Sequence, residues 1–132
     1  MIIFVTYCSA KKDESLRGTD RVVAPDLLYA SSRISRFVKA CNEKGVDWAI
    51  FSDKYGVLFP DSKVGWYDKA PESVTDEEFR SLLKNFDREL RAYDEIAFYY
   101  EKDSFCELYR RLLEGTELKS RVRMIERTEE IG

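Results

Sequence analysis

The sequence predicts an α/β fold, arranged as a three-layer sandwich with a mostly parallel sheet of about four strands and helices on both faces. Short apolar segments alternate with longer segments of helical periodicity, and right-handed crossovers between parallel strands produce this order. The chain has 132 residues, of which 44% are hydrophobic and 14% aromatic, so it can bury a sizeable core. No repeat or low-complexity tract divides it, and we expect residues 1–132 to form a single domain.

Four segments have the composition of strands: residues 2–7, 47–52, 95–100 and roughly 120–126. Each is a short segment rich in apolar residues, and segments with helical periodicity separate them. The sequence therefore predicts about four strands joined by crossover helices.

The first helical segment shows an apolar stripe at i, i+3, i+4 and i+7 spacing. The stripe consists of Leu27, Ala30, Ile34, Phe37, Val38 and Cys41. Pro25 suits the first helical turn, and Gly45 stands where the chain turns into the next strand.

A second helix is predicted after residue 75, with Phe79, Leu82, Leu83, Phe86, Leu90 and Tyr93 on one face. Thr75 and Glu78 have the spacing of a capping box at its start. Ser104 and Glu107 repeat that spacing, which predicts a third helix that Gly115 can end.

Composition excludes several kinds of chemistry. The chain contains no histidine, which removes Ser-His-Asp triads, Cys-His dyads and the zinc deaminase signature that requires histidine. Acid-base chemistry must then use Lys, Tyr, Cys, Asp or Glu side chains. With 22 basic and 25 acidic residues and a net charge of −3, the chain is no polycation, so nucleic-acid binding would need a local basic patch.

The location of the protein is also predicted. The apolar run of residues 1–5 is far shorter than a membrane span, and no basic segment precedes it as in a signal peptide. The three cysteines are widely spaced and fit neither a disulfide framework nor a CxxC metal clip. We expect a cytoplasmic protein in a reducing compartment, without membrane contact.

Polar residues follow the first two predicted strands. Cys8, Ser9, Lys11 and Lys12 follow the first, and Ser52, Asp53, Lys54, Tyr55 and Gly56 follow the second. Ligands of open parallel sheets bind outside the carboxyl ends of the strands, so we expect these two groups to face one crevice. Residues 9–23 and 57–73 follow these two strand ends and lack periodicity, as functional loops often do.

The candidate catalytic residues are Cys8, Lys11 and Lys54. Ammonium groups just beyond Cys8 could lower the pKa of its thiol, and a lysine desolvated beside another cation is a second candidate nucleophile. In the alternative interpretation, Cys8 is a small buried residue at a strand end and the lysines are solvated.

The candidate ligand-binding residues are Ser9, Lys12, Tyr29, Ser52, Tyr55, Gly56 and Tyr67. Tyr55 can stack on a planar ligand, and Gly56 permits a tight turn there. Alternatively, this segment is a plain turn in which Tyr55 packs against Phe59. The sequence specifies no cofactor and shows no cluster of metal ligands, although Asp53, Asp61 and Asp68 could offer carboxylates to a hard cation.

The combination of these motifs resembles a known family. The segments that carry the resemblance are Cys8-Ser9-x-Lys11-Lys12, Ala24-Pro25-Asp26-Leu27-Leu28-Tyr29, Ser52-x-Lys54-Tyr55-Gly56-Val57-Leu58, Pro60-Asp61 and Tyr67-Asp68. Together they look like the YaaA-related domain of unknown function, over about the first half of the chain.

This resemblance implies that Cys8, Ser9, Lys11, Tyr29, Ser52, Lys54, Tyr55 and Gly56 line one shared site. It also implies an association with DNA binding and protection from oxidative damage. The chain is shorter than the larger YaaA proteins, which carry an additional DNA-binding region, so we do not expect this domain alone to bind duplex DNA. A fainter similarity, confined to Cys-Ser-x-x-Lys, links it to archaeal tRNA base-modifying proteins in which a lysine is the nucleophile.

Three functions follow as hypotheses. The first is a domain that binds or acts on a nucleotide, nucleoside or damaged base at the ends of the first two strands. The second is a non-catalytic module that senses such a ligand or binds a partner. The third is a redox role for Cys8.

Overall fold

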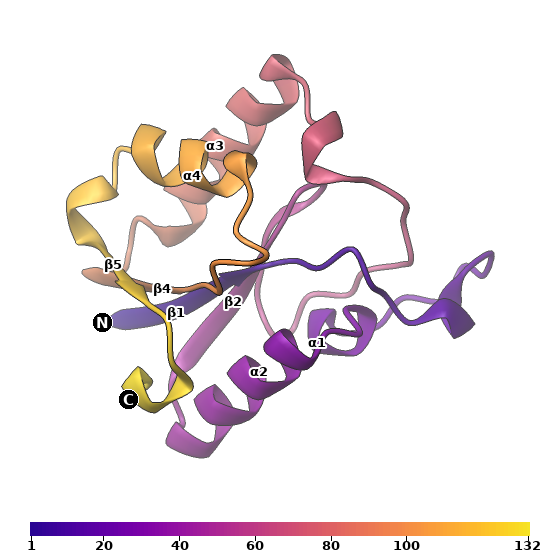
Figure 1. Ribbon diagram of the computed structural model, residues 1–132, viewed down its shortest axis with the longest axis horizontal. Helices are drawn as coiled ribbons and strands as arrows, with labels where there is room; N and C mark the ends of the chain where they lie inside the picture. The colour runs from indigo at the N-terminus through magenta and orange to yellow at the C-terminus, as the bar shows by residue number, and fades with distance from the viewer.

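The computed structural model describes residues 1–132 and shows one sheet between two helical layers (Figure 1). The sheet has five strands in the order β3-β2-β1-β4-β5. Their bounds are Ile2–Tyr7 for β1, Asp47–Ser52 for β2, Gly56–Leu58 for β3, Glu95–Tyr99 for β4 and Val122–Ile125 for β5. The predicted α/β class is confirmed.

The prediction of a mostly parallel sheet with about four strands is wrong, because the sheet is mixed and has a fifth strand. Strand β1 pairs in parallel with β2 and β4, and β4 pairs in parallel with β5. Strand β3 pairs with β2 in the antiparallel direction. With only three residues, β3 is too short to show a periodicity in the sequence.

Gly56 begins β3 and makes this hairpin possible. Its φ of 80° lies in the left-handed region that glycine adopts without strain. A side chain there would also collide with the side-chain amide of Asn85, whose Oδ1 accepts a hydrogen bond from the Val57 amide at 2.8 Å. Gly56 therefore shapes the backbone beside the candidate site.

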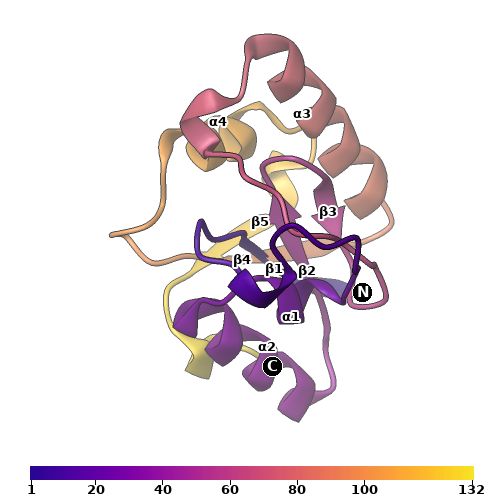
Figure 2. The same ribbon diagram turned by 90° about the vertical axis from the view of Figure 1, so that its right-hand side faces the viewer.

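Helices α1 (Pro25–Leu28) and α2 (Ser32–Lys44) cover one face of the sheet, and α3 (Asp76–Leu90) and α4 (Glu107–Gly115) cover the other (Figures 1 and 2). No helix combines the length and apolar composition that a membrane span requires. The predicted three layers are thus present, with two helices in each outer layer.

The first predicted helix is divided into two. The chain leaves helical geometry at Tyr29, which forms an isolated bridge with Lys12, and the Ser31 hydroxyl then caps α2. Leu27 and Ala30 are consequently exposed and do not join the predicted stripe. Its other four members, Ile34, Phe37, Val38 and Cys41, are buried as predicted.

Four of the predicted helix boundaries are confirmed, and two of them are Pro25 at the start of α1 and Gly115 at the end of α4. Gly45 ends α2 with a φ of 64°, and Thr75 and Glu78 form the capping box of α3. The capping box predicted at Ser104 is wrong, because α4 begins at Glu107 after Cys106. The Ser104 hydroxyl instead lies 2.7 Å from the Tyr7 hydroxyl, so it is unavailable to the helix.

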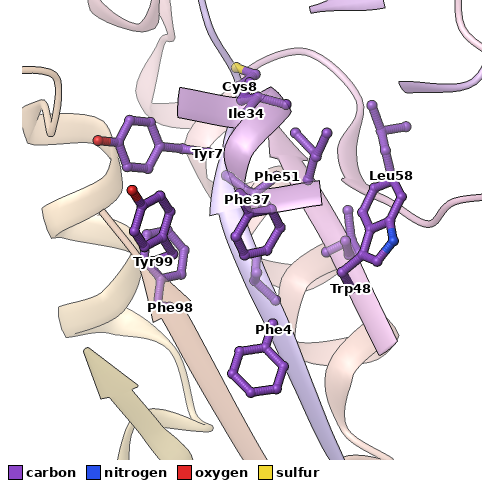
Figure 3. Close-up of a cluster of buried hydrophobic side chains, with 14 of the residues drawn as sticks. Phe4, Tyr7, Cys8, Ile34, Phe37, Trp48, Phe51, Leu58, Phe98 and Tyr99 are labelled. Atoms are coloured by element: carbon purple, nitrogen blue, oxygen red, sulfur yellow. The ribbon is translucent and has the colours of Figure 1, made fainter. Parts of the chain in front are cut away.

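Aromatic side chains pack against both faces of the sheet. Phe4, Phe37 and Tyr99 lie on the face that α2 covers, whereas Phe51 and Phe98 lie on the face that α3 and α4 cover (Figure 3). The rings of Phe37 and Tyr99 stack with their centroids 5.7 Å apart. This packing fixes the carboxyl ends of the central strands, where the candidate site residues begin.

The connections that follow β1 and β4 run on opposite faces of the sheet. After β1 the chain passes to the layer of α1 and α2, whereas after β4 it passes to the opposite layer through α4 (Figure 1). The loops that leave these two adjacent parallel strands therefore diverge. A crevice at such a switch point is the usual ligand site of an open α/β sheet.

Candidate functional site

Four buried polar side chains form a hydrogen-bonded cluster at the carboxyl end of β2. These residues, here called the Asp53 cluster, are Tyr29, Ser52, Asp53 and Tyr67. The Tyr67 hydroxyl lies 2.7 Å from that of Tyr29 and 3.0 Å from that of Ser52, and it donates a 3.0 Å hydrogen bond to Asp53 Oδ1. Residues from three separated segments thus meet at one hydroxyl group.

The direction of these hydrogen bonds follows from counting protons. An ionised Asp53 can only accept, so Tyr67 must donate to it. The Tyr29 and Ser52 hydroxyls then both donate to the two lone pairs of the Tyr67 oxygen. Ser52 Oγ accepts in turn from the backbone amides of Lys54 and Tyr55, at 3.0 Å each. Every hydroxyl group of the cluster therefore has its hydrogen-bond partners when Asp53 carries its charge.

One carboxylate oxygen of Asp53 has no hydrogen-bond partner in the chain. Oδ1 accepts from Tyr67, whereas Oδ2 accepts no hydrogen bond from the chain and is not sealed from solvent. Asp53 lines a surface depression of about 670 Å³ between the β2–β3 hairpin, the 68–69 segment and α3. Although the residue is only 3% exposed, it thus presents a free acceptor to this depression.

Burial raises the pKa of the Asp53 carboxyl above its ordinary value. The hydrogen bond from Tyr67 and the charge of Lys12 act in the opposite direction, but burial outweighs them. A buried carboxylate without an ion-pair partner is costly, and such groups are concentrated at functional sites.

The three candidate lysines lie in different surroundings. Lys12 is buried, and its Nζ donates to the Ala10 carbonyl and lies 4.3 Å from the Tyr67 ring centroid. Lys54 is exposed and lines the Asp53 depression, with its Nζ 5.4 Å from the same ring centroid. Lys11 is exposed, and none of its side-chain contacts joins it to the cluster. The desolvated lysine is therefore Lys12, rather than the predicted Lys11 or Lys54.

The predicted lowering of the Cys8 pKa is wrong. Burial and the negative charge of Asp53 raise the pKa of this thiol to about 11. Its sulfur lies 3.3 Å from the Tyr109 hydroxyl and accepts the Asp53 backbone amide at 3.4 Å. Cys8 is therefore a protonated, packed residue at neutral pH, as in the alternative interpretation of the sequence.

We expect Cys8 to react slowly with iodoacetamide at pH 8 in the native state. A rise in pKa from 9.0 to about 11 lowers the thiolate fraction about 100-fold, and burial slows the reaction further. Cys106, which is half-buried, is the internal control and should be alkylated first. Peptide mass spectrometry over time measures both rates. Labelling of Cys8 faster than Cys106 would contradict this prediction and support a redox role for Cys8.

The remaining predicted residues fall into two groups. Tyr55 is 40% exposed, and its ring lies edge-on to that of Tyr67 with centroids 5.3 Å apart, beside the Asp53 depression. Ser9 instead faces a second cavity, together with Cys8, and its hydroxyl donates to the Lys11 carbonyl. The structure thus has two separate cavities where the sequence predicts one crevice. Asp53 lines one of them and Cys8 lines the other.

Sequence reasoning missed the role of Asp53 as a free acceptor. Its position directly after a buried strand was visible, but it was considered only as one of three carboxylates for a cation. The structure gathers no group of three or more Cys, Asp or Glu side chains that could hold a metal ion. Tyr109, which contacts Cys8, lies in the third predicted helix, and nothing in the sequence marks it as a site residue.

The chain matches no protein-family model, no curated protein and no solved structure. Its function is therefore inferred from the residues and their geometry.

Proposed function

We propose that this domain binds a nucleotide-, nucleoside- or nucleobase-like ligand in the Asp53 depression. The observation that supports this best is the free Oδ2 of the buried Asp53 carboxylate, which can accept an N–H or O–H group of a ligand. A carboxylate held rigidly by a tyrosine hydroxyl is pre-organised for such a contact, because little freedom is lost on binding.

The surroundings of Asp53 fit the other parts of such a ligand. The partly exposed ring of Tyr55 offers a stacking surface for a planar base. Lys54 forms no ion pair, whereas Lys69 pairs with Glu78 at 3.2 Å. Lys54 is thus the cation of this depression best able to contact a phosphate or a carbonyl group.

Binding without turnover is favoured over catalysis at this site. Cys8 is protonated at neutral pH, and every hydroxyl of the cluster is engaged in a hydrogen bond, so neither a thiolate nor a free hydroxyl group is available as a nucleophile. The remaining candidates for covalent chemistry are the buried Lys12 and the free carboxylate oxygen of Asp53. The resemblance to YaaA-related domains supports a place for this binding in nucleic-acid modification or in the response to oxidative damage.

The test is thermal stabilisation by the four common nucleosides, their 5′-monophosphates and short single-stranded oligonucleotides. A ligand at about 100 times its Kd adds about 2.7 kcal/mol of stability, which shifts the Tm by several degrees. We expect one of these compounds to stabilise the wild type and the Lys63→Ala control, which removes an exposed lysine outside the depression. Lys54→Ala should lose most of the shift.

Two results would contradict the proposal. One is the absence of any shift across the whole panel, which would favour a protein partner. The other is an equal shift in wild type and Lys54→Ala, which would place the ligand elsewhere. Analysis of the recovered ligand by mass spectrometry separates binding from turnover, because a sensor returns its ligand unchanged.

A further inference from the structure

A second cavity, of about 520 Å³, lies at the switch point between the carboxyl ends of β1 and β4. The chain segments that line it include residues 7–10 after β1, the first turn of α2 and residues 101–106 after β4. This cavity shares no lining residue with the Asp53 depression. What it binds is therefore a question separate from the proposed function.

A buried guanidinium group lines this cavity. Arg33 is 5% exposed, and its terminal nitrogens donate to Thr6 Oγ1 at 2.6 Å, the Tyr7 carbonyl at 2.9 Å and the Cys8 carbonyl at 3.3 Å. The Tyr7 ring lies against the same group, with its centroid 3.9 Å from Cζ. These contacts hold the guanidinium rigidly, but none of them supplies a negative charge.

Arg33 has no ion-pair partner of its own within the chain, although the nearby Glu101 carboxylate attracts its charge. Arg33 forms no ion pair, because the nearby Glu101 carboxylate pairs with Arg36 at 2.6 Å. A buried charge without a partner is strongly unfavourable. In addition, the Nε–H of Arg33 has no acceptor and is not sealed from solvent.

The start of α2 adds further donors on the same wall. Ser32 and Arg33 occupy the first two helical positions, whose backbone amides have no acceptor inside a helix. The positive end of the 13-residue helix favours an anion there. The Ser32 hydroxyl is exposed at the same point. Guanidinium, amide and hydroxyl donors converging on one cavity form a typical phosphate site.

Acidic residues also line the cavity. They are Glu72, Glu101 and Asp103, of which Glu72 and Asp103 are exposed and form no ion pair. These carboxylates disfavour a polyanion such as a nucleic-acid backbone. They can, however, accept hydrogen bonds from hydroxyl groups that lie a few ångströms from a single phosphate, as in a sugar phosphate.

From these observations we propose that the Arg33 cavity binds the phosphate of a small phosphomonoester whose hydroxyl groups face Glu72 and Asp103. The phosphate supplies the ion-pair partner that Arg33 lacks and accepts hydrogen bonds from the first turn of α2. No covalent step is involved. The site goes beyond the proposed function, because none of its groups belongs to the Asp53 cluster.

Calorimetric titration with ribose 5-phosphate tests this proposal, with ribose as the compound that lacks the phosphate. Ser32→Asp is the decisive variant, because an acidic residue in the first turn favours the helix but repels an anion in the cavity. Ser35→Asp makes the same charge change on α2 at an exposed position outside the cavity. Both variants should therefore fold.

We expect saturable binding of ribose 5-phosphate, but not of ribose, to the wild type and to Ser35→Asp. Ser32→Asp should lose about tenfold or more in affinity, as should Arg33→Gln if it remains folded. The absence of saturable binding to the wild type, or equal affinity in Ser32→Asp, would overturn the proposal. The Asp53→Asn variant should bind ribose 5-phosphate normally, so a failure of this site and a failure of the proposed function are distinguishable.

Discussion

Asp53→Asn should make the protein more stable at neutral pH than the wild type, by on the order of 1 kcal/mol. The asparagine amide keeps an oxygen that can accept from Tyr67, but the substitution removes a charge that burial disfavours. The pKa of Asp53 is raised even though the charge of Lys12 attracts the carboxylate. Neutralising this carboxyl should therefore stabilise the folded state.

The stability difference should also depend on pH. The pKa of Asp53 is higher in the folded protein than its ordinary value of 3.8, so the folded state holds the proton more tightly than the unfolded state. This contribution to stability is fully present below pH 3.8 and is lost as the pH rises through the folded pKa. The advantage of Asp53→Asn should therefore be small in acid and grow toward neutral pH.

Urea unfolding of both proteins at a series of pH values from about 3.5 to 7 measures this difference. Asp13→Asn is the matched control, because Asp13 is not buried and hydrogen bonds lower its pKa. Its effect should have the opposite sign. A variant Asp53→Asn that is less stable than the wild type at every pH would show that the carboxylate is a structural group.

Tyr67→Phe should destabilise the fold by about 3 kcal/mol, the largest effect among the site variants. The hydroxyl of Tyr67 serves Tyr29, Ser52 and Asp53 at once, and all four side chains are buried. Its removal leaves an ionised carboxylate and two hydroxyl groups without their partner, while the volume of the ring is kept.

Tyr55→Phe is the control for this substitution. The Tyr55 hydroxyl forms no hydrogen bond within the chain and the residue is 40% exposed, so its loss should change stability by less than about 0.5 kcal/mol. Urea unfolding measures both variants. If Tyr67→Phe were as mild as Tyr55→Phe, the hydrogen bonds of the Asp53 cluster would contribute little to the folded state.

The main elements of the fold were predictable because their signals are local. Four strands and the boundaries at Gly45 and Thr75 follow from apolar composition, a left-handed turn and a capping box. Strand β3 was missed because it depends on pairing with β2. The break at Tyr29 was missed because Tyr29 bridges Lys12, a contact between segments that no periodicity encodes.

The candidate site was predictable in composition but not in geometry. Tyr29, Ser52 and Tyr67 were named as ligand-binding candidates, and the structure brings them together. The pKa of Cys8 was predicted with the wrong sign, because burial and the charge of Asp53 raise it, whereas the lysines adjacent in sequence do not contact the thiol. Arg33 looked like an ordinary helix residue, since only the diverging loops after β1 and β4 create the cavity that it lines.

The most direct test of the central claim is calorimetric titration of wild type and Asp53→Asn with the four common nucleosides at neutral pH. We predict saturable binding of at least one nucleoside to the wild type and a loss of about 100-fold in affinity in Asp53→Asn, because a buried charged acceptor is removed. Circular dichroism establishes that the variant is folded. Equal affinity in both proteins, or no binding to the wild type, would contradict the assignment of Asp53 as the ligand-binding carboxylate.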